Sequence, residues 1–182
     1  MKNYMLGLVL LMLFSCTNNN TKTTAPGDST AADSSAVVAT EAAVELANPV
    51  EQEIYAGYIK LKNTLVATKF EDSKKFAAAL ANSLKARAGC ENTALIADKI
   101  ASAEDISVQR KEFTALSSDV IALFKHAELK SGAIFVQHCP MANDGNGGDW
   151  LASESKIRNP YYGDEMMECG AVVEEIKATK KL

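Results

Sequence analysis

The stretch NPVEQEIYAGYIKLKNTL, residues 48–65, indicates the fold class because it joins a helix start to a helical apolar stripe. Asn48 is a typical N-cap residue, Pro49 suits the first turn, and Glu51 adds a favourable acidic side chain there. Apolar residues then recur at steps of four, three and four, at Ile54, Tyr58, Leu61 and Leu65. This spacing predicts an amphipathic helix.

Three further segments repeat this pattern. A helix that opens near Asp72 is expected to stop at Gly89, which suits the position after a helix end. A shorter helix holds residues 95–100, and a long one follows Asp105 and is expected to end at 130–132. Short connections favour antiparallel neighbours, so we predict a mainly α protein. Its fold would be an up-and-down helical bundle with an irregular, Cys/Met-rich C-terminal loop region.

The composition excludes several classes of protein. The chain has 182 residues, of which 47% are apolar, so it is not disordered throughout. It carries 19 basic and 23 acidic residues, and a net charge of −4 argues against nucleic-acid binding, which needs a basic surface. No second long apolar run follows the first, which argues against a multi-span membrane protein.

Residues 1–16, MKNYMLGLVLLMLFSC, have the layout of a lipoprotein signal peptide. Lys2 precedes an apolar stretch that is too short to span a bilayer. The last four residues resemble a bacterial lipobox, which usually has a small residue where Phe14 stands. We therefore expect Cys16 to become the lipidated first residue of the mature chain, held at a membrane surface. The alternative is an ordinary cleaved signal with a chance cysteine.

The rest of the chain divides into two parts. Residues 17–47 are rich in Thr, Asn, Ser and Ala and have few large apolar side chains. Such a segment cannot bury enough surface to offset its ordering entropy, so we predict a flexible low-complexity tether. Residues 48–182 are long enough to enclose a sizeable core and are expected to form a single domain.

Sulfur ligands gather in the last fifty residues. Beyond the signal peptide three methionines remain, and each lies within three residues of Cys139 or Cys169. Methionines that fill a core would be expected along the helical stripes, where none is found. Thioethers, thiolates and imidazole suit Cu(I), whereas Zn²⁺ takes Cys and His but rarely Met. The sequence therefore predicts a copper site formed by His138, Cys139, Met141, Met166 and Cys169.

The same cysteines allow a second interpretation. Disulfides persist outside the cytoplasm, and a bond between Cys139 and Cys169 would contribute about 3 kcal/mol by closing the loop between them. That loop would then be an interaction surface, with aromatic side chains of the kind that anchor interfaces at Trp150, Tyr161 and Tyr162. The two interpretations are compatible. Cys90 is expected to be a buried apolar thiol.

An enzymatic function is not expected. His138 and Cys139 are adjacent, so their side chains diverge and form a poor pair of base and nucleophile. The carboxylates of the C-terminal region have no diagnostic spacing, and no glycine-rich phosphate loop follows a strand.

The motif CPMA…WL…I-x-N-P-Y-x-G-x-x-M-x-x-C-G spans residues 139–142, 150–151 and 157–170. It resembles a bacterial domain family of no settled function, which occurs in exported lipoproteins and fused to periplasmic adaptor subunits of heavy-metal efflux systems. The resemblance covers roughly residues 50–176. It implies a helical domain associated with copper or silver handling, in the periplasm or on the outer surface of a Gram-negative bacterium. The implied partners are a membrane, through the lipid anchor, and an efflux adaptor or another envelope protein.

The resemblance also bears on single residues. Cys139, Met141, Met166 and Cys169 match the family pattern, whereas Met167 stands where another apolar residue is usual. The Cys-Pro-Met triplet resembles a heavy-metal-binding motif of copper pumps, which has His where Ala142 stands. We therefore predict a lipid-anchored module that binds Cu(I) for efflux, storage or tolerance. The alternative is a structural or interaction domain of the cell envelope stapled by a Cys139–Cys169 disulfide.

Overall fold

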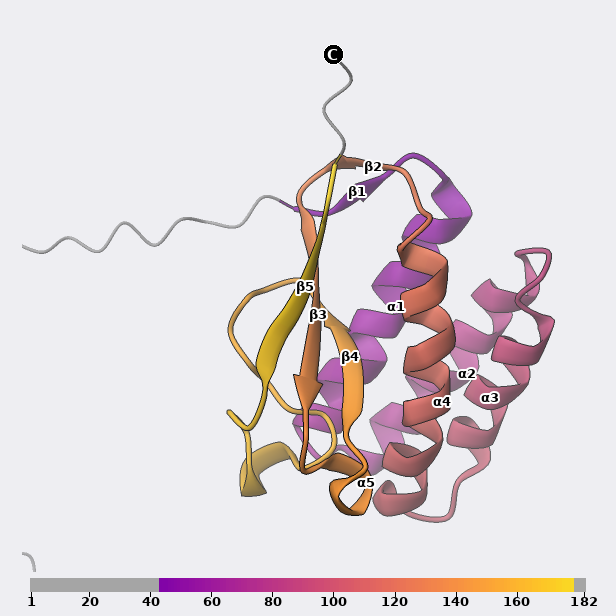
Figure 1. Ribbon diagram of the computed structural model, residues 1–182. Helices are drawn as coiled ribbons and strands as arrows, with labels where there is room; N and C mark the ends of the chain where they lie inside the picture. The colour runs from indigo at the N-terminus through magenta and orange to yellow at the C-terminus, as the bar shows by residue number, and fades with distance from the viewer. Residues whose placement is uncertain (1–42, 179–182) are drawn as a thin grey trace, which may run out of the picture. The chain divides into compact units, whose positions relative to one another are not determined.

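A computed structural model of the protein describes residues 43–178. Four helices follow one another, and each packs against the next, as Figure 1 shows: α1 (Pro49–Val66), α2 (Phe70–Lys85), α3 (Glu91–Ser102) and α4 (Ile106–Phe124). None of the helices in this part of the chain is long and apolar enough to cross a membrane. The predicted signal peptide, the lipidation residue Cys16 and most of the predicted tether lie outside the described residues.

Among the described residues, five strands form two antiparallel sheets. Strands β1 (Glu45–Leu46) and β2 (Leu129–Ser131) make a two-stranded sheet, so an ordered element precedes the predicted domain start at Asn48. In the second sheet β3 (Ala133–Cys139) lies between β4 (Gly148–Ala152) and β5 (Ala171–Lys177). Two short elements lie in the connections, α5 (Ala142–Gly145) and the 3-10 helix η1 (Gly163–Glu165).

The predicted fold class, a helical bundle, is wrong, because the protein is a mixed α/β structure with two small sheets. The sheets were not predicted, although residues 133–137 form a short β-prone run, because the strands lack the alternation of a half-buried strand. In β3 five of seven residues are buried, and in β5 six of seven are exposed. A strand such as β3, buried on both faces, and a strand such as β5, exposed on both faces, show no alternation of apolar and polar residues.

The helix ends were predicted with mixed success. The start of α1 is confirmed, since Asn48 Oδ1 accepts hydrogen bonds from the backbone N–H groups of Val50 and Glu51 at 2.9 and 3.4 Å. However, α2 ends at Lys85, well before Gly89. Helix α4 ends at Phe124 rather than at 130–132, because Leu129–Ser131 pairs with β1 instead.

Tyr58 joins the helices to the sheet. Its hydroxyl lies 2.7 Å from Ser117 Oγ on α4 and accepts a hydrogen bond from the backbone N–H of Leu151 on β4 at 3.1 Å. Its ring stacks on Phe113 with 5.4 Å between centroids, a contact that adds about 1 kcal/mol to the area it buries. These contacts fix β4, and through it β3, against α1 and α4.

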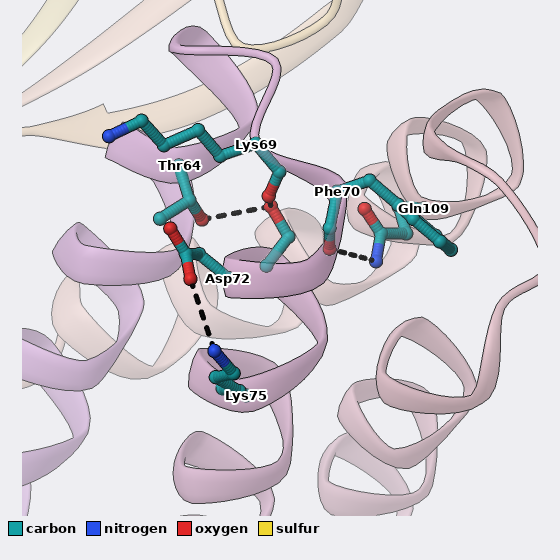
Figure 2. Close-up of polar contacts among 7 residues, drawn as sticks. Thr64, Lys69, Phe70, Asp72, Lys75 and Gln109 are labelled. Atoms are coloured by element: carbon teal, nitrogen blue, oxygen red, sulfur yellow. Dashed lines mark hydrogen bonds and ion pairs between the residues drawn. The ribbon is translucent and has the colours of Figure 1, made fainter.

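Polar contacts fix the corner between α1 and α2 (Figure 2). The Ser73 hydroxyl lies 2.9 Å from both Thr64 Oγ1 and the carbonyl oxygen of Lys69. From α4, the buried side-chain amide of Gln109 donates to the carbonyl oxygen of Phe70 at 3.2 Å. The corner therefore orients three helices relative to one another.

The burial of Lys62 on α1 should make the free energy of unfolding depend on pH. Its side chain is 1% exposed, and burial lowers its pKa from 10.5 to about 8, opposed by the charge of Glu154. The unfolded chain therefore binds more protons than the folded one between pH 8 and 10.5, so this residue makes stability rise with pH in that window.

We expect Lys62→Met to raise the free energy of unfolding at pH 7 and to flatten its rise between pH 8 and 10. The buried tyrosines are common to both proteins, so the difference between their urea-unfolding curves isolates Lys62. An equal pH dependence in the two proteins would contradict the burial argument.

Candidate functional site

Strand pairing brings together the two cysteines of the C-terminal region. In the β3–β5 ladder His138 pairs with Ala171, which places Cys139 and Cys169 at the same end of the two strands. Their Sγ atoms lie 3.0 Å apart, although 30 residues separate them in the sequence. Cys139 is fully buried and Cys169 is partly exposed. Two of the five predicted ligands are therefore in contact.

Gly170 permits this close approach. Its φ is +146°, and a Cβ there would lie 2.8 Å from the carbonyl oxygen of His138 and 3.0 Å from the Trp150 ring. Any side chain would therefore push the segment that carries Cys169 away from β3. Trp150 itself is fully buried and donates its indole N–H to Gln137 Oε1 at 2.7 Å.

Asn159, which the sequence did not single out, organises the loop before Cys169. Its buried side chain donates to the carbonyl oxygen of Cys169 at 2.9 Å and accepts from the backbone N–H of Tyr161 at 2.8 Å. Its own N–H donates to Met167 O at 2.9 Å, and its carbonyl oxygen accepts from Gly163 N at 3.0 Å. One residue therefore fixes both ends of the turn between 159 and 169. The Asn159–Pro160 pair was visible in the sequence motif, but the hydrogen-bond partners of Asn159 depend on the sheet.

Arg110 and Gly163 attach the same loop to the helices. The Arg110 guanidinium donates to the carbonyl oxygen of Pro160 at 3.0 Å and to that of Leu65 at 3.2 Å. Gly163 has φ +57°, and a Cβ there would meet Thr68 Oγ1 at 2.6 Å and the Val66 carbonyl oxygen at 2.8 Å. The loop backbone therefore lies directly on the end of α1.

We expect Gly163→Ala to lower the free energy of unfolding by about 2 kcal/mol, because the new methyl group meets backbone as well as a side chain and φ is positive. Gly89→Ala is the matched control, since Gly89 also has a positive φ but no atom within 4 Å of the added Cβ. Chemical unfolding gives the loss of stability in each variant, and the difference between the two losses is the part caused by the steric contacts at Gly163. Equal losses would show that only backbone strain matters at Gly163.

The three methionines of the described residues occupy the two turns beside Cys139 and Cys169. Met141 follows β3, is 54% exposed, and accepts a hydrogen bond on its carbonyl oxygen from the Tyr162 hydroxyl. Met166 is partly buried, and its carbonyl oxygen accepts from the backbone N–H of Cys169 at 3.1 Å. Met167 is also partly buried. Each predicted thioether ligand thus lies within three residues of one member of the cysteine pair.

His138 lies apart from the cysteine pair. It is registered opposite Asp149 on β4, and its Nδ1 is 2.7 Å from Asp149 Oδ1. Cys139 is registered opposite Gly148 instead. Because successive side chains of a strand point to opposite faces, the imidazole and the Cys139 thiol project from opposite sides of β3.

The environment of Cys169 favours the protonated form of its thiol. The hydrogen bond with Cys139 raises the pKa of the Cys169 thiol, and burial raises it further. Burial raises the pKa of Tyr162, with a smaller contribution from Cys139, so the phenol remains a donor to Met141. A metal ion that binds the thiols as thiolates would therefore release protons.

A cavity of about 530 Å³ adjoins this region. Its wall carries Arg110 and Lys111 from α4, with Tyr162 and Glu165 from the loop. Asn143, also in the wall, has a φ of +53° and is held by a hydrogen bond from the Thr114 hydroxyl at 3.0 Å. Tyr162 thus borders both the cavity and the thiol pair, a neighbourhood that the sequence did not reveal.

Comparisons with known proteins identify a relationship for the helical part only. Residues 54–132 match a family model described as "Protein of unknown function (DUF3347)". The match begins within α1 and ends just after β2, so it includes none of the sulfur residues at 139, 141, 166 and 169. Neither a search of curated proteins nor a search of solved structures gave a match.

Proposed function

We propose that this protein is an exported, lipid-anchored module that binds Cu(I) through sulfur. The observation that carries the proposal is the 3.0 Å distance between Cys139 Sγ and Cys169 Sγ. Two thiolates that begin this close can bind one soft cation with little movement of the backbone. Strand pairing and the Asn159 hydrogen bonds provide the necessary preorganisation.

The remaining ligands are thioethers. Within residues 43–178 no three His, Cys, Asp or Glu side chains form a metal-binding group, so any third ligand from this part of the chain would be of another type. Met141 and Met166 lie in the turns next to Cys139 and Cys169. A set of two thiolates and two thioethers favours Cu(I) over Zn²⁺. His138 lies outside this set, because it projects from the other face of β3.

The cellular setting rests on the sequence. A lipid on Cys16 would hold the domain at a membrane, in the periplasm or on the outer surface of a Gram-negative bacterium. The resemblance of the C-terminal motif supports a heavy-metal efflux adaptor or another envelope protein as partner. The exposure of Met141 supports direct transfer of the metal to such a partner, because this ligand is accessible from solvent.

The Met141→Leu/Met166→Leu double variant tests the ligand set. In reduced protein carrying Cys16→Ser, we expect its affinity for Cu(I) to fall by roughly 100-fold, about tenfold for each thioether. Competition with a chromophoric Cu(I) chelator measures the change. Met167→Leu is the matched control and should bind as the parent does. An unchanged affinity in the double variant would refute the thioether ligands.

The second candidate is a stapled interaction domain, in which the two cysteines form a disulfide. It is favoured by exposed apolar side chains on β5, an outer strand of the three-stranded sheet: Val172 is 40% and Val173 59% exposed. Comparing the Cu(I) affinity of reduced and oxidised protein separates the two candidates. If the cysteines serve only as a disulfide, reduction should not raise the affinity for Cu(I).

A further inference from the structure

The two sulfur atoms of the site differ in their access to solvent. Cys139 ends a central strand and is 0% exposed, whereas Cys169 lies in the turn before an outer strand and is partly exposed. Their separation of 3.0 Å exceeds a disulfide bond of about 2.05 Å by about 1 Å. The pair is thus placed for bond formation, with only one member open to an external reagent.

We infer that the pair carries out thiol–disulfide exchange, with Cys169 as the exchanging cysteine and Cys139 as the resolving one. The Cys169 thiolate attacks an external disulfide, forms a mixed disulfide and releases one thiol. The Cys139 thiolate then attacks Cys169 Sγ, closes the intramolecular disulfide and releases the second thiol. The external disulfide gains the two electrons that the cysteines lose, and the two protons go to the released thiols.

Exchange would also control the proposed metal site, and this consequence rests on the proposed function. The reduced pair offers two thiolates, whereas the disulfide removes both as strong ligands. Bound Cu(I) would in turn occupy Cys169 Sγ and protect it from attack. The pair would therefore have an oxidised state without metal and a reduced state that binds it.

The loop can deliver the attacking sulfur without unfolding. Asn159 holds the carbonyl oxygen of Cys169, and Gly170 lies against β3, so the backbone on both sides of the sulfur is fixed. Bringing the two Sγ atoms from 3.0 Å to bonding distance therefore requires mainly a rotation of the Cys169 side chain. Cys90, the other described cysteine, is buried at the start of α3 and serves as an internal control.

Oxidised glutathione is the probe, applied to the full chain carrying Cys16→Ser and followed by intact-mass spectrometry and peptide mapping. The parent should lose two hydrogens and yield a 139–169 cross-linked peptide. Cys139→Ser should instead trap a stable glutathione adduct on Cys169. Cys169→Ser should leave Cys139 unmodified. The assay is run at pH 8, because the hydrogen bond with Cys139 raises the pKa of the Cys169 thiol.

Three outcomes would overturn the inference: no cross-link in the parent, an adduct on Cys139 in Cys169→Ser, or modification of Cys90 before Cys169. Cys139→Ala provides a second trap if the buried serine prevents folding, which circular dichroism detects. A Cu(I) titration of the reduced parent is independent of this assay. Cross-linking without Cu(I) binding would refute the proposed function alone, and Cu(I) binding without cross-linking would refute the exchange alone.

Discussion

Cys169→Ser is expected to weaken Cu(I) binding by the reduced chain by roughly 100- to 1000-fold. Structural zinc sites with four ligands contribute about 10–16 kcal/mol, or about 2.5–4 kcal/mol for each ligand, and each 1.4 kcal/mol is about a factor of ten in Kd. Serine removes the thiolate but leaves a side chain of similar shape. Because Cys169 is partly exposed, we expect the fold to be retained.

The control for this prediction is Cys90→Ser in the same Cys16→Ser background. Cys90 is buried, with 8% of its surface exposed, and burial raises the pKa of its thiol. It is therefore a buried thiol like Cys139, but it lies directly before α3, outside the proposed site. Its removal should leave the Kd for Cu(I) unchanged, as measured by chelator competition. A loss shared by both variants would mean that any thiol of the chain suffices.

Asn159→Leu is expected to lower the free energy of unfolding by about 4 kcal/mol. The side chain is 0% exposed and is bonded to the carbonyl oxygen of Cys169 and the N–H of Tyr161. Leucine has a similar volume but leaves both backbone groups without these partners. Each buried polar group that loses its partner costs about 1–3 kcal/mol.

Chemical unfolding under reducing conditions measures this loss. Asn63→Leu is the matched control, because Asn63 is exposed on α1, and exposed substitutions usually change stability by less than about 0.5 kcal/mol. We also expect Asn159→Leu to slow formation of the 139–169 cross-link, since the turn that carries Cys169 loses its anchor. A stability equal to that of the parent would show that the turn is fixed by other contacts.

The helices could be predicted from the sequence because their signals are local. The N-cap of α1 lies within three residues of its partners, and the stripe residues Tyr58, Leu61 and Leu65 are all fully buried. Leu95, which belongs to a weaker stripe, is 58% exposed. In this short helix only Ile100 of the predicted apolar residues is fully buried. So few apolar residues do not determine which face of a helix is buried.

The sheet and the site could be predicted only in part. Both interpretations of the C-terminal cysteines required Cys139 and Cys169 to lie close together, and their Sγ atoms lie 3.0 Å apart. The β3–β5 pairing that achieves this includes a register shift after Val136, which no local pattern predicts. The separation of His138 from Cys139 follows from strand alternation, and it becomes visible only once residues 133–139 are known to be a strand. The role of Asn159 likewise depends on partners that the sheet places.

In the proposed site, reduced Cys139 and Cys169 bind one Cu(I) ion together with neighbouring methionines. The most direct test is a Cu(I) titration of the reduced full chain carrying Cys16→Ser against a chromophoric chelator, with free thiols counted on the same sample. We predict that the chain removes one Cu(I) per molecule from the chelator, and that prior oxidation of the pair abolishes this. A reduced chain with three free thiols that removes no copper would contradict the claim.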